Sequence, residues 1–291
     1  MKSTDIDNRS SFVRERPDTP SELRQRLYHG ELFMFAPTDA SLRLVDAAQA
    51  SIDTAFAESG CARSVHRNMS SDAFFETAGK LRRQFYKTPE FHLLVAELIA
   101  CMDFEVQQTG FDPARLRIVL PGGHENPAAA AMYYGHRDTW YANPQAMLTW
   151  WIPLHDVSVS DSFCFFPDYF DQAVQNDSEI FNFDDWVEED EKKLIGWQDK
   201  TTGLTAQYPQ LLEEPRGTRV PVECRRGELL LFSGQHLHRT SKQETDFTRF
   251  SLDFRTVDVP DQEQGREARN VDNRSTGSWM KKFLTVADAL S

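Results

Sequence analysis

The sequence predicts a mainly β domain, an antiparallel sandwich or jelly roll, with helices packed on one side. Residues 21–110 place apolar side chains at the three- and four-residue spacing of amphipathic helices. Beyond residue 110 the chain changes to short aromatic or alternating segments separated by turn residues, which is typical of strands. A run of helices followed by many short strands indicates a two-layer β architecture with segregated helices.

Three helices are expected before the strands begin. The first, over residues 40–59, follows the start signal Pro37-Thr38-Asp39. The second covers residues 71–87, and the third covers residues 90–108 after Pro89, a residue that suits a first helical turn. Residues 1–20 are polar and charged, so we expect a flexible N-terminal arm.

The strands are predicted to belong to one domain over residues 21–257. The whole chain of 291 residues is long enough to bury one large core. The region 171–222 interrupts the strands, and so long an insertion favours a lid over a functional site. The polar residues 258–291 are expected to form a C-terminal extension that ends in a short helix. The predicted strands cover residues 115–123, 131–141, 145–154, 161–170, 227–234 and 248–257.

Composition argues against several classes of partner. The formal net charge of −13 would repel nucleic-acid phosphates and anionic lipid surfaces. No stretch reaches the roughly 18 apolar residues of a spanning helix, and the N-terminus has no apolar signal region. We therefore expect no nucleic-acid partner, no membrane partner and a cytoplasmic location. The four cysteines are scattered, so a cysteine-based zinc site is not expected.

The segment GHRDTWY places a histidine and a carboxylate two residues apart, at His136 and Asp138. On a strand both would point to the same face and could reach one ion. A buried His–Asp hydrogen bond is the competing structural interpretation. A third ligand would decide between them, and the strand-like GELLLFSGQHLHRT offers His236 and His238. Two histidines and one carboxylate form the facial triad of non-haem Fe(II) oxygenases.

A possible anion clamp follows 11 residues after His238, at Arg249 and Ser251. These residues would share one strand face, where a guanidinium beside a hydroxyl suits a carboxylate.

Together, His136-x-Asp138, GELLLFSGQHLHRT and Arg249-x-Ser251 resemble the Fe(II)- and 2-oxoglutarate-dependent oxygenases, most closely the phytanoyl-CoA dioxygenase-like branch. The resemblance spans roughly residues 110–257 and implies a double-stranded β-helix, or cupin-like, core. It also implies Fe(II), 2-oxoglutarate as cosubstrate and O2. By this resemblance, His136, Asp138 and His238 hold the iron. His236 would lie near His238 without binding the iron.

The resemblance also assigns the cosubstrate site. Arg249 and Ser251 would hold the distal carboxylate of 2-oxoglutarate, helped by Thr240, and Trp151 matches an aromatic position that lines the cosubstrate. Arg117, on the preceding strand, could meet a carboxylate or keto group of either ligand.

The implied activity is hydroxylation of an unactivated C–H bond, with release of succinate and CO2. In related halogenases a small residue replaces the carboxylate ligand, so Asp138 favours hydroxylation over chlorination. Desaturation, cyclisation and epimerisation use the same triad and stay open as alternatives. A non-redox cupin-like binding protein is another, although a clamp like Arg249 would then lack a purpose.

The expected substrate is a small metabolite or natural-product intermediate, and the sequence does not name it. Trp140 is expected on the same strand face as the ligands. The indole of Trp186, in the predicted lid, could close over substrate. Aromatic residues of a sandwich are more often plain core. The candidates for the substrate pocket are Trp140, Tyr134, Trp186 and His236.

Overall fold

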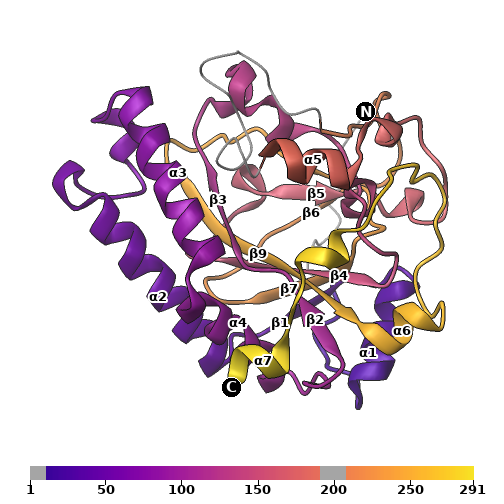
Figure 1. Ribbon diagram of the computed structural model, residues 1–291. Helices are drawn as coiled ribbons and strands as arrows, with labels where there is room; N and C mark the ends of the chain where they lie inside the picture. The colour runs from indigo at the N-terminus through magenta and orange to yellow at the C-terminus, as the bar shows by residue number, and fades with distance from the viewer. Residues whose placement is uncertain (1–10, 191–207) are drawn as a thin grey trace.

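The computed structural model describes residues 11–190 and 208–291, which form two antiparallel sheets with helices against the larger one (Figure 1). The helices are α1 (Pro20–Tyr28), α2 (Asp39–Ala55), α3 (Ser71–Lys87), α4 (Pro89–Cys101), α5 (Phe183–Asp190), α6 (Val259–Glu263) and α7 (Val286–Leu290). The strands are β1 (Phe33–Phe35), β2 (Thr109–Phe111), β3 (Arg115–Val119), β4 (Met147–Pro153), β5 (Phe163–Phe165), β6 (Val220–Pro221), β7 (Leu229–Ser233), β8 (His238–Thr240), β9 (Arg249–Asp258) and β10 (Leu284–Thr285).

The larger sheet has the strand order β1-β7-β4-β9-β2-β10, and β3 pairs with the long strand β9 beside β2. The smaller sheet has the order β6-β5-β8. Every pairing in both sheets is antiparallel. The predicted mainly β domain with helices on one side is confirmed, and the arrangement is consistent with a jelly roll.

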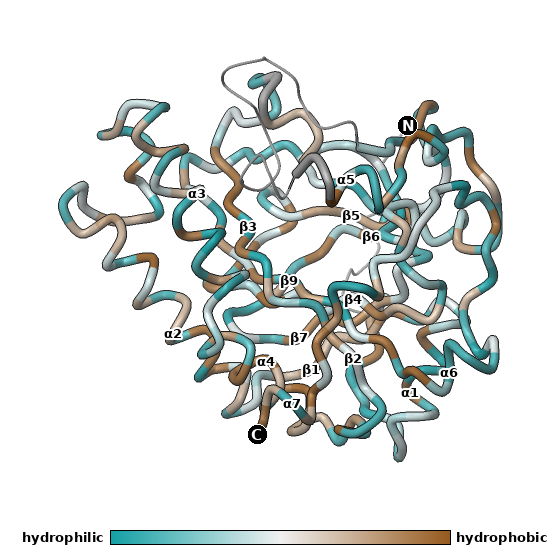
Figure 2. Tube along the Cα trace, viewed as in Figure 1, coloured by the Kyte–Doolittle hydropathy of each residue, from teal (hydrophilic) through white to brown (hydrophobic). Residues whose placement is uncertain are grey.

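The period of two along the central strands separates two cores. One face of β4 and β9 presents Trp150, Phe250 and Phe254 to the core shared with α2, α3 and α4. The opposite face packs against the smaller sheet, where Trp151 meets Phe163. In Figure 2 the helix α3 is mostly hydrophilic, whereas β1 and β3 carry hydrophobic stretches. The functional residues described below lie on the face between the sheets.

The predicted helix starts are confirmed. Thr38 caps α2, because its side chain accepts a hydrogen bond from the Ser41 amide while the Ser41 hydroxyl accepts one from the Thr38 amide. Pro89 occupies the first turn of α4. That helix ends at Cys101 and not at residue 108 as predicted, since Asp103 adopts a left-handed backbone with φ of 57°.

The strand predicted over residues 131–141 is wrong. Residues Pro127–Tyr133 and Asp138–Tyr141 are 3₁₀ helices, and between them His136 forms a single bridge to His238. The aromatic residues of this segment raised its strand propensity. Aromatic side chains can also pack against their neighbours from 3₁₀ turns, which is what this segment forms.

Both ends of the described chain are tied to the domain. Phe12 is buried and the Val13 amide donates to the Leu32 carbonyl, so residues 11–20 are not the flexible arm that was expected; residues 1–10 lie outside the described residues. Within the predicted extension 258–291, β10 adds a strand beside β2, and Val286 of α7 joins the core that contains α4.

The predicted insertion 171–222 contains α5 and, at its end, β6 of the smaller sheet. Phe181 and Phe183 are buried, whereas residues 191–207 of the expected lid lie outside the described residues. Among the described helices, none has the length and apolar character needed to cross a membrane.

Candidate metal centre

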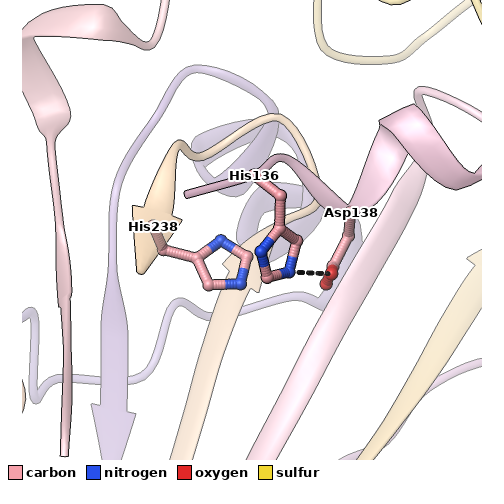
Figure 3. A group of neighbouring side chains, drawn as sticks. All are labelled: His136, Asp138 and His238. Carbon is pink, nitrogen blue, oxygen red and sulfur yellow. Dashed lines mark ion pairs between the residues drawn. The ribbon is translucent and has the colours of Figure 1, made fainter. Parts of the chain in front are cut away.

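Three side chains converge between the sheets. His136 lies in the bridge to β8, Asp138 begins a 3₁₀ turn, and His238 is the first residue of β8 (Figure 3). Each offers one ligand atom, and these atoms all lie within 4.8 Å of one another. The extended backbone of Arg137 keeps His136 and Asp138 on the same side, as the two-residue spacing predicted, although the segment is not a strand.

The hydrogen bonds of both histidines place a proton on Nδ1, and Nε2 of His136 lies 3.6 Å from Oδ1 of Asp138 (Figure 3). Nδ1 of His136 lies 2.9 Å from the Tyr134 carbonyl, and Nδ1 of His238 lies 3.0 Å from the His236 carbonyl. A carbonyl accepts only from an N–H, so Nδ1 carries the proton and Nε2 presents its lone pair. Burial lowers the pKa of His238 to about 4, which keeps this ring neutral at physiological pH.

Asp138 is buried and held in the ionised form. Its Oδ2 accepts a 2.6 Å hydrogen bond from the Thr149 hydroxyl, and its Oδ1 lies 3.5 Å from an Arg255 guanidinium nitrogen. Burial alone would raise the pKa of this carboxyl group, but Arg255 and the two histidines outweigh it and keep the pKa well below its usual range. The three groups therefore offer two imidazoles and one carboxylate, the donor set of a facial triad.

A chain of ion pairs extends from Asp138 along β9. Arg255 lies 3.6 Å from Asp112 and 3.2 Å from Asp253, and Asp253 accepts two hydrogen bonds from Arg117. Arg117, which was expected to contact one of the ligands, is thus paired with a carboxylate of the protein itself. Its role toward a ligand stays a prediction.

Arg249 differs from these arginines. Its side chain is buried, with Nη1 donating to the Asp161 carbonyl at 3.2 Å. Within the described residues its Nε has no hydrogen-bond partner, and no carboxylate lies within ion-pair distance. Burial lowers the pKa of Arg249 to about 10, so the guanidinium still carries its charge at neutral pH. A buried cation of this kind requires an anion.

The other residues predicted for the cosubstrate surround Arg249. The centre of its guanidinium lies 6.0 Å from the Trp151 ring, and the Trp151 indole donates to the Ser251 hydroxyl at 3.1 Å. Phe163 contacts both Trp151 and His238, with ring separations of 5.2 and 6.0 Å, so these rings connect the clamp to the triad. Thr240 is half-buried on β8, opposite Phe163.

Trp140 packs into a small hydrophobic cluster. Its ring is fully buried among Cys164, Phe166 and Leu237, and its indole nitrogen donates to Asp272 at 2.8 Å. The expected strand face shared with the ligands is wrong, because a 3₁₀ turn starts at Asp138. A role of Trp140 in substrate binding stays a prediction.

The three remaining substrate candidates occupy different places. Tyr134 supports His136 through its backbone carbonyl, and its side chain is half-buried. Trp186 of α5 packs against Trp279, with ring centroids 4.9 Å apart. His236 is buried behind His238 and lies 4.6 Å from the Phe170 ring, and it is not part of the three-residue ligand group. Their roles in substrate binding stay predictions.

Sequence reasoning did not select three residues that contact the centre. Tyr141 packs 5.4 Å from the His136 ring, and burial together with the nearby Asp138 raises its pKa. Thr149 and Arg255 contact Asp138 directly. The signal for Arg255 was present, since RFSLDFRTV places polar side chains at every second position of one strand.

His155 supports the start of β9. Its Nε2 accepts a 3.1 Å hydrogen bond from the Phe250 amide, beside Arg249. Burial, and the charges of Arg63 and Arg249, lower the pKa of His155 to about 4.

Comparison with known proteins identifies one family. The family model described as phytanoyl-CoA dioxygenase matches residues 36–251. No curated protein matches the chain significantly.

Several solved structures resemble the chain at low similarity. The epimerase SnoN in complex with Fe3+, alpha ketoglutarate and nogalamycin RO has 18% identity and a TM-score of 0.40, covering 82% of this chain and 84% of its own. The carbocyclase SnoK from nogalamycin biosynthesis has 14% identity and a TM-score of 0.40, with 89% and 95% coverage. EvdO2 from Micromonospora carbonacea var. aurantiaca, complexed with 2-oxoglutarate, has 11% identity and a TM-score of 0.44, with 89% and 100% coverage.

Replacing Thr149 by valine should weaken metal binding about tenfold, because the carboxylate of Asp138 loses the hydroxyl that orients it. An anaerobic Co(II) titration followed by visible absorption measures this effect. Thr256→Val is the matched control: Thr256 is also buried but accepts from the Trp150 indole on the helix-facing side of the sheet. Equal Co(II) affinity in Thr149→Val and wild type would contradict the geometry.

The stability of the protein should fall between about pH 6.5 and pH 4. The pKa of His155 is about 4 in the folded protein against 6.5 for the ordinary side chain, so its contribution is complete above pH 6.5 and is lost as the pH falls through this window. The loss from this residue is at most about 3 kcal/mol. Urea unfolding at several pH values should show a smaller loss for His155→Gln, and identical pH profiles would refute this role.

Proposed function

Because the chain belongs to the phytanoyl-CoA dioxygenase family, we propose that it hydroxylates a C–H bond of a small organic substrate. It is a non-haem oxygenase that depends on iron and 2-oxoglutarate. The observation that carries the proposal is the combination of the three-ligand group with a buried arginine, Arg249, that has no carboxylate partner among the described residues. A cupin-like binding protein without oxygen chemistry would need the ligands but not the arginine.

The donor set fits iron. Nε2 of His136, Nε2 of His238 and one carboxylate oxygen of Asp138 would hold the ion. When bound, Fe(II) and 2-oxoglutarate supply the oxidation by O2, with release of succinate and CO2. The remaining tasks, which are binding, orientation and exclusion of water, belong to the chain.

The Arg249 guanidinium, which pairs with no carboxylate of residues 11–190 and 208–291, fits the cosubstrate. Arg249 would bind the distal carboxylate of 2-oxoglutarate through its free Nε, and Ser251 would add a hydroxyl on the same strand face. Trp151 fixes that hydroxyl and lies beside the guanidinium, so the carboxylate would be held in a largely dry setting. The hydroxyl of Thr240 on β8 would help to hold the same carboxylate.

The aromatic side chains near His136 suit a substrate surface. Tyr141 packs against Phe181 and Tyr208, with ring separations of 5.6 and 6.1 Å. These rings would exclude water from the reacting C–H bond while Asp138 and the histidines keep the metal in place. The substrate would be a small molecule with an apolar part that packs against these rings.

The proposal predicts that wild type converts 2-oxoglutarate to succinate in air with Fe(II) and ascorbate, and that His238→Ala does not, because a ligand is lost. Anaerobic binding of 2-oxoglutarate to the metal-loaded protein is the second measurement. Arg249→Gln should weaken that binding at least tenfold and leave Co(II) affinity unchanged, since it removes a charge-assisted hydrogen bond but no metal ligand.

Arg117→Gln separates the two arginines that were predicted to meet a carboxylate. Its side chain is already paired with Asp253, so this variant should weaken 2-oxoglutarate binding less than Arg249→Gln does. A wild-type protein that neither releases succinate nor binds 2-oxoglutarate in the presence of metal would refute the proposed function.

A further inference from the structure

Arg137, between the ligands His136 and Asp138, points away from them into the protein. Its side chain is fully buried, and Nε donates to both carboxylate oxygens of Asp272 at 3.1 and 3.2 Å. The other guanidinium nitrogens donate to the backbone carbonyls of Gln235, Tyr169 and Gln172. The residue between the two ligands is thus fixed by an ion pair and three hydrogen bonds.

Asp272 collects donors from three parts of the chain. In addition to Arg137, its carboxylate accepts from the Trp140 indole at 2.8 Å and from the Val174 amide at 3.0 Å. Its side chain is only 3% exposed. One carboxylate therefore joins both ends of the turn that carries Asp138 to the segment that precedes α5.

Residues 272–279, here called the C-terminal strap, continue this support. The Ser275 hydroxyl accepts from the Ala142 amide at 3.0 Å, and the Trp279 amide donates to the Ala142 carbonyl at the same distance. Ala142 ends the turn with a positive φ of 57°, a conformation that alanine rarely adopts without outside support.

The strap also contacts the segment that leads into α5. The Phe183 amide donates to the Thr276 carbonyl at 2.9 Å, and the Thr276 amide donates to the Phe181 carbonyl at 3.0 Å. The Trp279 ring lies 4.9 Å from both Phe183 and Trp186. The start of α5 and the turn with the metal ligands therefore share one support.

We propose that Asp272 is a positioning residue for the metal centre, acting through Arg137 and Trp140 on the turn that presents His136 and Asp138. The inference rests on the proposed function, because it assumes that these side chains bind a metal. Its physical reason is that, within the part of the chain that the structure describes, the ligand segment has only one β bridge, so no sheet ladder sets its geometry. Ligands must be held within about 0.5 Å of their productive positions, and the ion pair supplies that constraint from the other side of the turn.

The test compares Asp272→Asn with Asp261→Asn. Asp261 is a matched control, because it is also buried and ion-paired with a buried arginine, Arg24, but contacts neither the turn nor the strap. Both variants should lower the melting temperature. Only Asp272→Asn should weaken anaerobic Co(II) binding, by about tenfold, and change the visible Co(II) absorption bands, whereas Asp261→Asn should stay within about twofold of wild type.

Ser275→Ala provides a milder variant of the same strap if Asp272→Asn does not fold. It removes the hydroxyl that accepts from Ala142, and it should weaken Co(II) binding about threefold in a folded protein. Wild-type Co(II) affinity and absorption in the folded strap variants would overturn the inference and show a purely structural role. Failure of wild type itself to bind Co(II) would instead refute the metal centre, and the inference with it.

Discussion

Strand β9 carries charged side chains into the space between two sheets. Because removing these charges from water is costly, it constrains which residues can face them from the neighbouring strands. Arg249, Asp253 and Arg255 alternate with Phe250 and Phe254, which face the helices. Breaking one buried pair by removing a partner costs about 3–5 kcal/mol, so the neighbouring strands must supply opposite charges at set positions. Arg117 of β3 and Asp112 before it meet this requirement.

The same constraint explains the chemistry of the centre. Asp138 stays ionised because Arg255 faces it, and a carboxylate held in this form is ready to bind a cation. Arg249, at the other end of the strand, has no such partner among the described residues. A divalent metal at one end and a dicarboxylate that reaches to the other would complete the charge pairing that the protein leaves open.

Much of this arrangement could be predicted from the sequence, because its signals are local. The two-residue spacing of His136 and Asp138 needs only one extended residue between them, which Arg137 supplies, and the strand period that includes Arg249 and Ser251 is present in β9. The start of α2 was also predictable, because the cap formed by Thr38 is a local signal.

The failures concern features that tertiary contacts decide. Whether residues 131–141 form a strand depends on what pairs with them, and among the described residues only His136 forms a β bridge. Trp140 consequently turns toward Asp272, a residue 132 positions away that no local pattern connects to it. Thr149 became significant only when β4 placed its hydroxyl against Asp138. Long-range contacts of this kind leave no periodic signal in a single sequence.

A crystal structure of the protein grown anaerobically with Mn(II) and 2-oxoglutarate tests the central claim most directly. The account predicts Mn(II) bound by Nε2 of His136, Nε2 of His238 and a carboxylate oxygen of Asp138, with the distal carboxylate of 2-oxoglutarate accepting a hydrogen bond from Nε of Arg249. Metal bound by other residues, or a cosubstrate carboxylate on Arg117 with Arg249 still unpaired, would contradict it.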